Sequence, residues 1–252
     1  MSRSSDPGPT ASLFAAATLR RAIQDYRVLL DRGYPDKQVL QLVGDRYRLT
    51  RDYRGMLQRG VFSTSASGLR MQRRLTRIQC TQRCAQAQAS GRPGELLVDG
   101  HNVLFTLWNC RAGRPIVLAT DGFIRDIGGT SSRLPHDERF SRLAVELCEV
   151  IASLELPVVR VLLDEQLPYS GDQRAELEAL WRQRGDWESD DSSVQVSFET
   201  NRSVDACIAA DDSGAEVIAT SDTGIIDRCN APVFDLGGYV VEQIYRRSPR
   251  KL

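Results

Sequence analysis

Hydrophobic residues in the first 90 positions recur at helical spacing. Over residues 12–31 the apolar side chains fall three and four positions apart, which places them on one helix face. The same spacing predicts three further helices, over residues 35–47, 51–60 and 68–89. We therefore expect a small all-helical domain over residues 12–90, preceded by a polar, disordered tail at 1–11 that has no signal-peptide core.

After the Ser-Gly-Arg-Pro-Gly turn at 90–94 the pattern changes to short apolar runs that alternate with helical segments. The runs occupy residues 96–99, 116–120, 158–164, 194–198, 217–222 and 232–236. The helical segments lie near 137–155, 172–185, 203–213 and 239–246. This alternation is typical of an α/β domain, here 95–246, in which helices flank a parallel sheet. Ligands bind such sheets outside the carboxyl ends of the strands.

Four of the predicted strands end in an aspartate: Asp99, Asp121, Asp164 and Asp222. One such aspartate alone is usually a helix N-cap. Four at one sheet edge would raise each other's pKa and cost stability unless a cation compensated them. Carboxylate oxygens are the ligands that Mg²⁺ and Mn²⁺ prefer. Asp205 is a fifth acid, and it is either a first-turn residue that suits the helix dipole or a further metal ligand beside Asp222.

The net charge of zero conceals a division between the two halves of the chain. Residues 1–94 carry 17 Lys and Arg against 6 Asp and Glu, whereas residues 95–252 carry 16 against 27. The basic residues of the first half are nearly all arginine, whose planar guanidinium suits phosphate. We expect Arg73, Arg74 and Arg77 of the fourth helix to contact RNA phosphates.

Membrane insertion and disulfide chemistry are not indicated. No apolar run reaches the roughly 20 residues of a membrane span. The six cysteines are scattered, and Cys80 and Cys84 form too small a set for a zinc site without a second pair. We expect a cytoplasmic protein with reduced thiols and no membrane partner.

Two blocks resemble known sequence motifs. VDGHNVL at 98–104 resembles the first-strand motif of PIN-like and NYN-type nucleases. VDACIAA at 204–210, followed by VIATSDTGIID at 217–227, resembles their later pattern of an acid at a helix start, a strand and Thr-x-Asp. In finer detail the chain is similar to a two-part family of unknown function, in which a small helical domain, here the segment 32–60, accompanies a PIN-like domain.

The resemblance implies a role for individual residues. Asp99, Asp205 and Asp222 would be the catalytic metal ligands, and Asp164 an additional strand-end ligand. Asn102 would orient the first loop, while Thr220 and Ser221 would line the site and contact substrate. PIN-like enzymes usually carry a further acid in a central helix, for which this chain offers only Glu146 or Glu149, neither in a recognisable motif.

The segment 121–140 is a long polar loop in sequence, rich in glycine, serine and charge. Backbone N–H groups of Gly-rich turns can bind anions. The residues expected to contact phosphate or help place a metal are Asp121, Arg125, Asp126 and Arg133. The alternative is an ordinary surface excursion. His101, beside Asp99, either fills the turn or touches metal or substrate.

These patterns together predict a divalent-metal-dependent ribonuclease that uses Mg²⁺ or Mn²⁺, with a basic helical domain that binds RNA. The main alternative is a non-catalytic RNA-binding adaptor on the same PIN-like fold. A phosphatase on a doubly wound sheet is a third possibility, but the Asp-x-Asp that a phosphoaspartate mechanism needs is replaced by Asp99-Gly100-His101.

Overall fold

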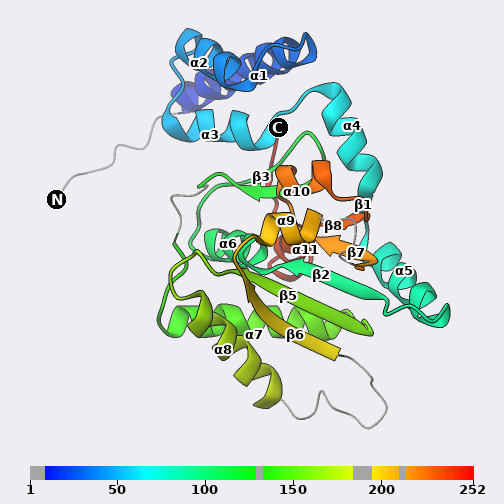
Figure 1. The fold of residues 1–252 in the computed structure, drawn as a ribbon. Helices are drawn as coiled ribbons and strands as arrows, with labels where there is room; N and C mark the ends of the chain where they lie inside the picture. The colour runs from blue at the N-terminus through cyan, green and yellow to red at the C-terminus, as the bar shows by residue number, and fades with distance from the viewer. Residues whose placement is uncertain (1–8, 129–132, 184–194, 210–213) are drawn as a thin grey trace.

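The computed structural model describes residues 9–128, 133–183, 195–209 and 214–252. Its first part is helical, as the spacing predicted (Figure 1). The helices are α1 (Pro9–Asp31), α2 (Asp36–Arg46), α3 (Arg51–Gly60), α4 (Thr64–Arg73) and α5 (Arg77–Ala89). None of the helices in these described ranges is both long and apolar enough to cross a membrane.

Helices α1 to α3 enclose a small core of their own. Tyr26 of α1, Val39 and Val43 of α2 and Leu57 of α3 are buried together. Helix α3 begins where Thr50 accepts a hydrogen bond from the Tyr53 amide. An N-cap of this kind satisfies one of the amides that a helix start leaves unpaired.

The prediction of a single helix over residues 68–89 is wrong. The chain breaks at strand β1 (Arg74–Leu75), and Thr76 then starts α5 through a capping box with Gln79. Strand β1 pairs in parallel with Val233–Phe234, so this segment joins the main sheet. Helical propensity on both sides of the break conceals it, and the Thr-x-x-Gln capping signal marks where the second helix begins.

The main sheet has six strands, all parallel, as expected for the second half of the chain. Its order is β1, β8 (Val233–Phe234), β7 (Val217–Ala219), β2 (Glu95–Asp99), β5 (Val158–Asp164) and β6 (Gln195–Asn201). The other helices are α6 (Gly100–Arg111), α7 (Glu138–Ser153), α8 (Ser170–Gln183), α9 (Val204–Ala209), α10 (Thr223–Arg228) and α11 (Leu236–Tyr239), which continues into a π-helical turn at Val240–Ile244.

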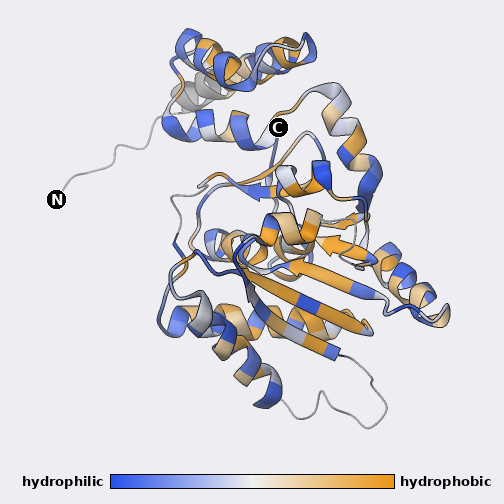
Figure 2. Ribbon diagram, in the orientation of Figure 1, coloured by the Kyte–Doolittle hydropathy of each residue, from blue (hydrophilic) through white to orange (hydrophobic). Residues whose placement is uncertain are grey.

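The sheet is buried on both faces. Leu96 and Val98 of β2 pack into the cluster that contains α6 and α7 residues, while Leu97 packs into a second cluster with Ile208 of α9 and Ile225 of α10. Alternate residues of a strand point to opposite faces, which explains the division. Figure 2 shows that β2, β5 and β7 are hydrophobic along most of their length, as expected for a sheet covered on both sides.

The run at 116–120 does not belong to this sheet. Strand β3 (Ile116–Leu118) pairs antiparallel with β4 (Ile124–Asp126) and parallel with β9 (Arg250–Lys251) in a separate three-stranded sheet. Asp121, in the turn between β3 and β4, therefore does not end a strand of the main sheet. We predicted that four parallel strands of one sheet each end in an aspartate, and this prediction is wrong for Asp121.

The strand order creates a switch point next to Asp99. From β2 the chain builds β5 and β6 outward on one side, then returns to place β7 on the other side of β2 and β8 beyond it. The loops after β2 and β7 consequently leave the sheet side by side but in opposite directions. Open α/β sheets bind their ligands in the crevice at this position.

Candidate functional site

Asp99 ends β2 at the switch point and is 7% exposed. Its Oδ2 accepts a hydrogen bond from the Thr220 hydroxyl at 2.9 Å, and its Oδ1 accepts one from the Asn102 amide at 3.3 Å. The second bond makes Asp99 the N-cap of α6. The carboxylate is thus held between the first turn of α6 and the residue that follows β7.

The loop after β7 is bonded to the loop after β2 at several points. The Asp222 amide donates to the Thr220 hydroxyl oxygen at 3.1 Å, and that hydroxyl in turn donates to Asp99. The Asn102 Oδ1 accepts from both the amide and the hydroxyl of Ser221, at 2.9 and 3.0 Å. Asn102, Thr220 and Ser221 therefore lie together around Asp99. Their roles toward a substrate stay predictions.

Asp222 and Asp205 lie on neighbouring short helices. Asp222 caps α10, because its Oδ1 accepts from the amides of Gly224 and Ile225 at 2.7 and 3.2 Å. Asp205 lies in the first turn of α9 and is exposed, with Arg228 of α10 3.9 Å from its Oδ2. The capping role expected of a lone strand-end aspartate is real for Asp99 and Asp222, but it uses only part of each carboxylate's hydrogen-bonding capacity.

The carboxylates share an electrostatic field. Burial raises the pKa of Asp99 to about 7, and the negative charges of Asp222 and Asp205 add to the rise, against the hydrogen bonds from Thr220 and Asn102. The pKa of Asp205 is also raised, by partial desolvation, although its side chain is 67% exposed, and by the charge of Asp222, with a smaller contribution from Asp164 and opposition from Arg228. The charges of Asp222 and Asp205 thus act on Asp99, and those of Asp222 and Asp164 act on Asp205, which is a repulsion that a bound cation would relieve.

The fit to a metal is good in donor chemistry and incomplete in spacing. The four carboxylates supply the oxygen donors that Mg²⁺ or Mn²⁺ takes. In the described part of the chain, however, no three His, Cys, Asp or Glu side chains are grouped closely enough to hold an ion. A cation at this edge would therefore have to draw the carboxylates closer together.

Asp164 and His101 secure the β5 side of the site. His101 is buried, and its Nδ1 accepts a hydrogen bond from the Asp164 amide at 2.8 Å. Its Nε2 lies 2.9 Å from the Gln173 Oε1, so this nitrogen carries the proton. Burial lowers the pKa of His101, and the imidazole is neutral at pH 7. His101 therefore fills the turn and ties β5 and α8 to the loop after β2.

The loop residues Asp121 and Arg125 are buried rather than presented to solvent. The Arg125 guanidinium donates to both Asp121 oxygens, at 2.8 and 2.9 Å, and its Nε donates to the Ser221 carbonyl at 2.7 Å. Asp126 is also buried and lies 3.5 Å from Arg59. Arg133 is exposed. The structure thus places Asp121, Arg125 and Asp126 behind the candidate site and gives them protein partners, and only Arg133 lies on the surface as expected.

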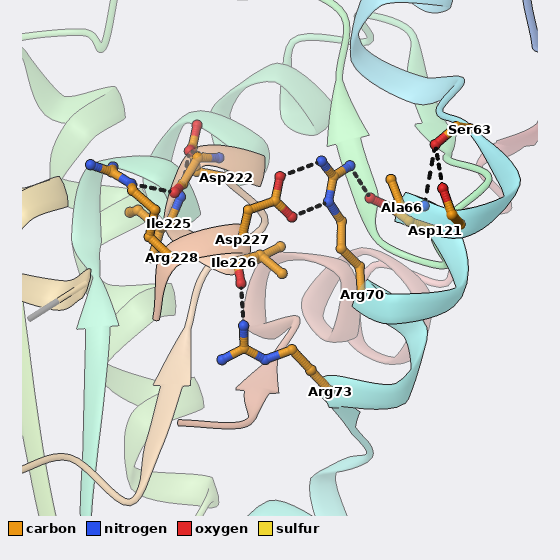
Figure 3. A network of polar contacts seen from close by, with 12 residues as sticks. Ser63, Ala66, Arg70, Arg73, Asp121, Asp222, Ile225, Ile226, Asp227 and Arg228 are labelled. Carbon is orange, nitrogen blue, oxygen red and sulfur yellow. Dashed lines mark hydrogen bonds and ion pairs between the residues drawn. The ribbon is translucent and has the colours of Figure 1, made fainter. Parts of the chain in front are cut away.

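Arg70 of α4 extends this buried network into α10 (Figure 3). Its guanidinium donates to both oxygens of Asp227 at 2.7 and 2.6 Å and to Asp121 at 3.2 Å. Arg73 donates to the carbonyl of Ile226 at 2.6 Å. Helix α10, whose first turn Asp222 caps, is therefore fixed to α4 by two arginines.

The other arginines expected to contact RNA also pack against or bond to protein groups. The Arg74 guanidinium lies over the Phe123 ring, 5.8 Å from its centroid, and Arg77 donates to the Ser153 carbonyl at 2.6 Å. Arg83 and Arg92 pair with Glu216. Part of the charge division between the two halves of the chain is therefore used within the molecule, where it holds the halves together.

Of the two candidates for a central helix acid, Glu146 does not join the site. Glu146 of α7 accepts from Arg111, with an Nε–Oε2 distance of 3.3 Å, and from the Tyr245 hydroxyl. Asp99 caps the first turn of the 12-residue helix α6, and Arg111, the partner of Glu146, is its last residue. About 17 Å of helix therefore separates Asp99 from Arg111. Glu149 is exposed on α7.

Sequence reasoning overlooked Asp235, which also follows a strand of the sheet. It caps α11 through the Gly238 amide at 2.8 Å and accepts from the Ile124 amide at 2.7 Å. Burial raises its pKa. The signal was the one that singled out Asp99, an aspartate directly after a buried apolar run, but β8 is only two residues long.

Comparison with known proteins places the chain in a family. The family "Domain of unknown function (DUF5616)" matches residues 89–239, more than half of the chain, and "Protein of unknown function (DUF434)" matches residues 18–73. An uncharacterized protein of Methanocaldococcus jannaschii, MJ0935, is 25% identical over 154 residues, which cover 61% of this chain and 68% of the relative. No solved structure matches the chain. The expected two-part organisation is confirmed, and the chain belongs to the family of the domain of unknown function DUF5616.

Proposed function

We propose that this protein is a divalent-metal-dependent ribonuclease of PIN-like type, with its active site at the switch point between β2 and β7. The observation that supports this most is the geometry at the switch point, where the Thr220 hydroxyl donates to Asp99 and accepts from the Asp222 amide. The charges of Asp222 and Asp205, which lie far away in the chain, also contribute to the raised pKa of Asp99. A buried carboxylate with a pKa near 7 is typical of functional sites. The motifs around these residues resemble those of PIN-like and NYN-type nucleases, which is the basis for choosing RNA as substrate.

Asp99, Asp164, Asp205 and Asp222 would hold Mg²⁺ or Mn²⁺. When bound, the ion supplies an activated water and stabilises the leaving oxygen of the phosphodiester. The chain's own residues orient the ligands, because the Thr220 hydroxyl and the Asn102 amide hold the two oxygens of Asp99. Asn102 also fixes Ser221, and with it the direction in which Asp222 leaves β7.

The test is a cleavage assay on end-labelled RNAs, one unstructured and one a hairpin, with Mn²⁺, with Mg²⁺ and with EDTA. We expect the wild-type protein to cleave in Mn²⁺ and not in EDTA. Asp99→Asn and Asp222→Asn should each reduce the rate by at least about 100-fold, on the order of the loss when an essential catalytic group is removed. Asp25→Asn, on α1, is the matched control and should cleave like the wild type.

The alternative is a non-catalytic RNA-binding adaptor on the same fold. The spacing of the acids favours it, because no three of them are grouped for an ion in the described residues and two of them cap helices. An adaptor should bind RNA equally with and without Mn²⁺ and should cleave none of the RNAs. Metal-dependent cleavage that Asp99→Asn abolishes would eliminate the adaptor.

A further inference from the structure

A large cleft separates the helical part of the chain from the α/β part. Its volume is about 1270 Å³, and it is lined by residues of α2, α3 and α4 on one side and by the segments around Arg114, Arg125 and 127–128 on the other. The lining also includes Ser221, Asp222 and Thr223, at the candidate site. Pockets for small ligands usually measure about 300–1,000 Å³, so this cleft has room for a segment of a polymer.

Arginine dominates the charged lining of the cleft. The lining includes six arginines and three aspartates: Arg51, Arg54, Arg59, Arg70, Arg114 and Arg125, with Asp36, Asp52 and Asp222. Several of these arginines have acidic partners, but the partners are Asp45, Asp121, Asp126 and Asp227, none of which lines the cleft. Asp121 and Asp126 are buried, whereas the Asp45 and Asp227 side chains are 65% and 50% exposed. Four of the six arginines are therefore already paired with an acid, and Arg51 and Arg114 are the two that are exposed.

Two aromatic residues also line the cleft, in different environments. Phe62 lies between two guanidinium groups, with Arg70 4.4 Å and Arg125 5.1 Å from its ring centroid. Tyr34, just before α2, is 56% exposed. An exposed aromatic ring within an arginine-lined groove is the combination on which the bases of a single strand stack while the phosphates meet the cations.

We propose that this cleft is the track on which a single-stranded nucleic acid lies, with a phosphodiester delivered to Asp222 in its lining. The inference rests on the proposed function, because it concerns the substrate of the same site. Arg51 and Arg114 are the cleft arginines we assign to phosphate, because both are exposed in the lining, although Arg114 also donates to the Asn109 Oδ1 at 2.6 Å. A single strand is favoured over a duplex because Tyr34 can stack only on unpaired bases.

The test measures binding without catalysis. Fluorescence anisotropy in EDTA would compare a labelled 12-nucleotide RNA, a DNA strand of the same sequence and the RNA duplex. The double variant Arg51→Glu, Arg114→Glu should bind the RNA strand at least about tenfold more weakly. The slope of log K against log salt concentration should also be less steep by about 1 to 2, since each lost phosphate contact removes roughly 0.7 from it. Tyr34→Ala should weaken binding at least about fivefold.

The matched control is Arg20→Glu, Arg21→Glu, which makes the same change of charge at two exposed residues of α1 outside the cleft. We expect less than about a twofold effect from it. Equal binding of the DNA strand supports the track, because both strands offer phosphates and base faces. The proposal is overturned if the wild type binds no single strand, if the duplex binds more tightly, or if the two double variants weaken binding equally.

The same assay separates this inference from the proposed catalysis. Asp99→Asn should bind the RNA strand as the wild type does, because Asp99 does not line the cleft. If the wild type binds along the cleft but cleaves nothing, the nuclease proposal fails and the track stands. If the wild type cleaves RNA and the cleft double variant also binds and cleaves normally, the cleft proposal is overturned while the nuclease proposal stands.

Discussion

Arg125 Nε donates a hydrogen bond to the backbone carbonyl of Ser221 at 2.7 Å. Ser221 lies between Thr220, which bonds to Asp99, and Asp222, which caps α10. The same guanidinium pairs with Asp121, which Arg70 of α4 also contacts. The helical part of the chain therefore reaches the candidate site through a continuous line of buried charges, and it supports that site structurally.

Replacing Arg125 with Met should destabilise the protein by up to about 3–5 kcal/mol, because it removes the bidentate partner of a fully buried carboxylate and leaves Asp121 only the single Arg70 contact at 3.2 Å. Urea unfolding measures the change. The double variant Asp121→Asn, Arg125→Met should lose less than the sum of the two single variants, since the carboxylate that lost its bidentate partner is no longer charged. Arg142→Ala, at an exposed residue of α7, is the control and should change stability by less than about 0.5 kcal/mol. A loss below about 1 kcal/mol for Arg125→Met would show that the network is not a structural support.

The α/β part should not fold independently of α4 and α5. Strand β1 pairs in the main sheet, and Cys80 and Cys84 of α5 are buried in the same cluster as Leu96 and Val98. A fragment of residues 89–252 lacks β1 and α5, which leaves the edge of β8 unpaired and the Leu96 and Val98 cluster partly exposed. We therefore expect this fragment to show no cooperative unfolding transition by circular dichroism. The longer fragment 62–252 keeps them and should unfold cooperatively. Native-like unfolding of the shorter fragment would contradict this.

In metal-free protein, Asp99 should make stability depend on pH. Its folded-state pKa of about 7 lies above the ordinary value of 3.8, so the folded protein binds this proton more tightly than the unfolded chain does. The free energy of unfolding should therefore fall as pH rises from about 4 to about 7, and level off above that, with a total of up to about 4 kcal/mol.

Asp99→Asn removes this contribution. Urea unfolding in EDTA at several pH values should give a difference between wild type and variant that changes across this window. Asp205 and Asp235, whose pKa values are also raised, and His101, whose pKa is lowered, are present in both proteins, so their contributions largely cancel in the comparison. Stability curves that run parallel for wild type and Asp99→Asn would contradict the prediction, and Asp25→Asn should follow the wild type.

The central strands could be predicted from sequence because parallel strands covered on both faces appear as continuous apolar runs. The runs that became β2, β5 and β7 are of this kind, and they predicted the adjacency of Asp99, Asp164 and Asp222. The run at 116–120 has the same composition, but its pairing in a second sheet depends on β4 and β9, one of them more than 130 residues away. Local composition does not specify such a partner.

The burial of the polar loop could not be predicted for a related reason. Asp121 and Arg125 appear solvent-exposed in sequence, because charged residues usually are. They are buried because Arg70, 51 residues before Asp121, closes the ion network from α4. The charge division between the halves was visible in the sequence, but whether arginine meets a nucleic acid or the other half of the molecule depends on packing between distant segments.

The central claim is that Asp99, Asp205 and Asp222 act on a single divalent ion, and calorimetric titration of the purified protein with Mn²⁺ tests it directly. We predict one saturable site in the wild type. Asp99→Asn, Asp205→Asn and Asp222→Asn should each weaken it at least about tenfold, as loss of a ligand does, while Asp25→Asn leaves it unchanged. Equal Mn²⁺ affinity in wild type and all three site variants would contradict the account.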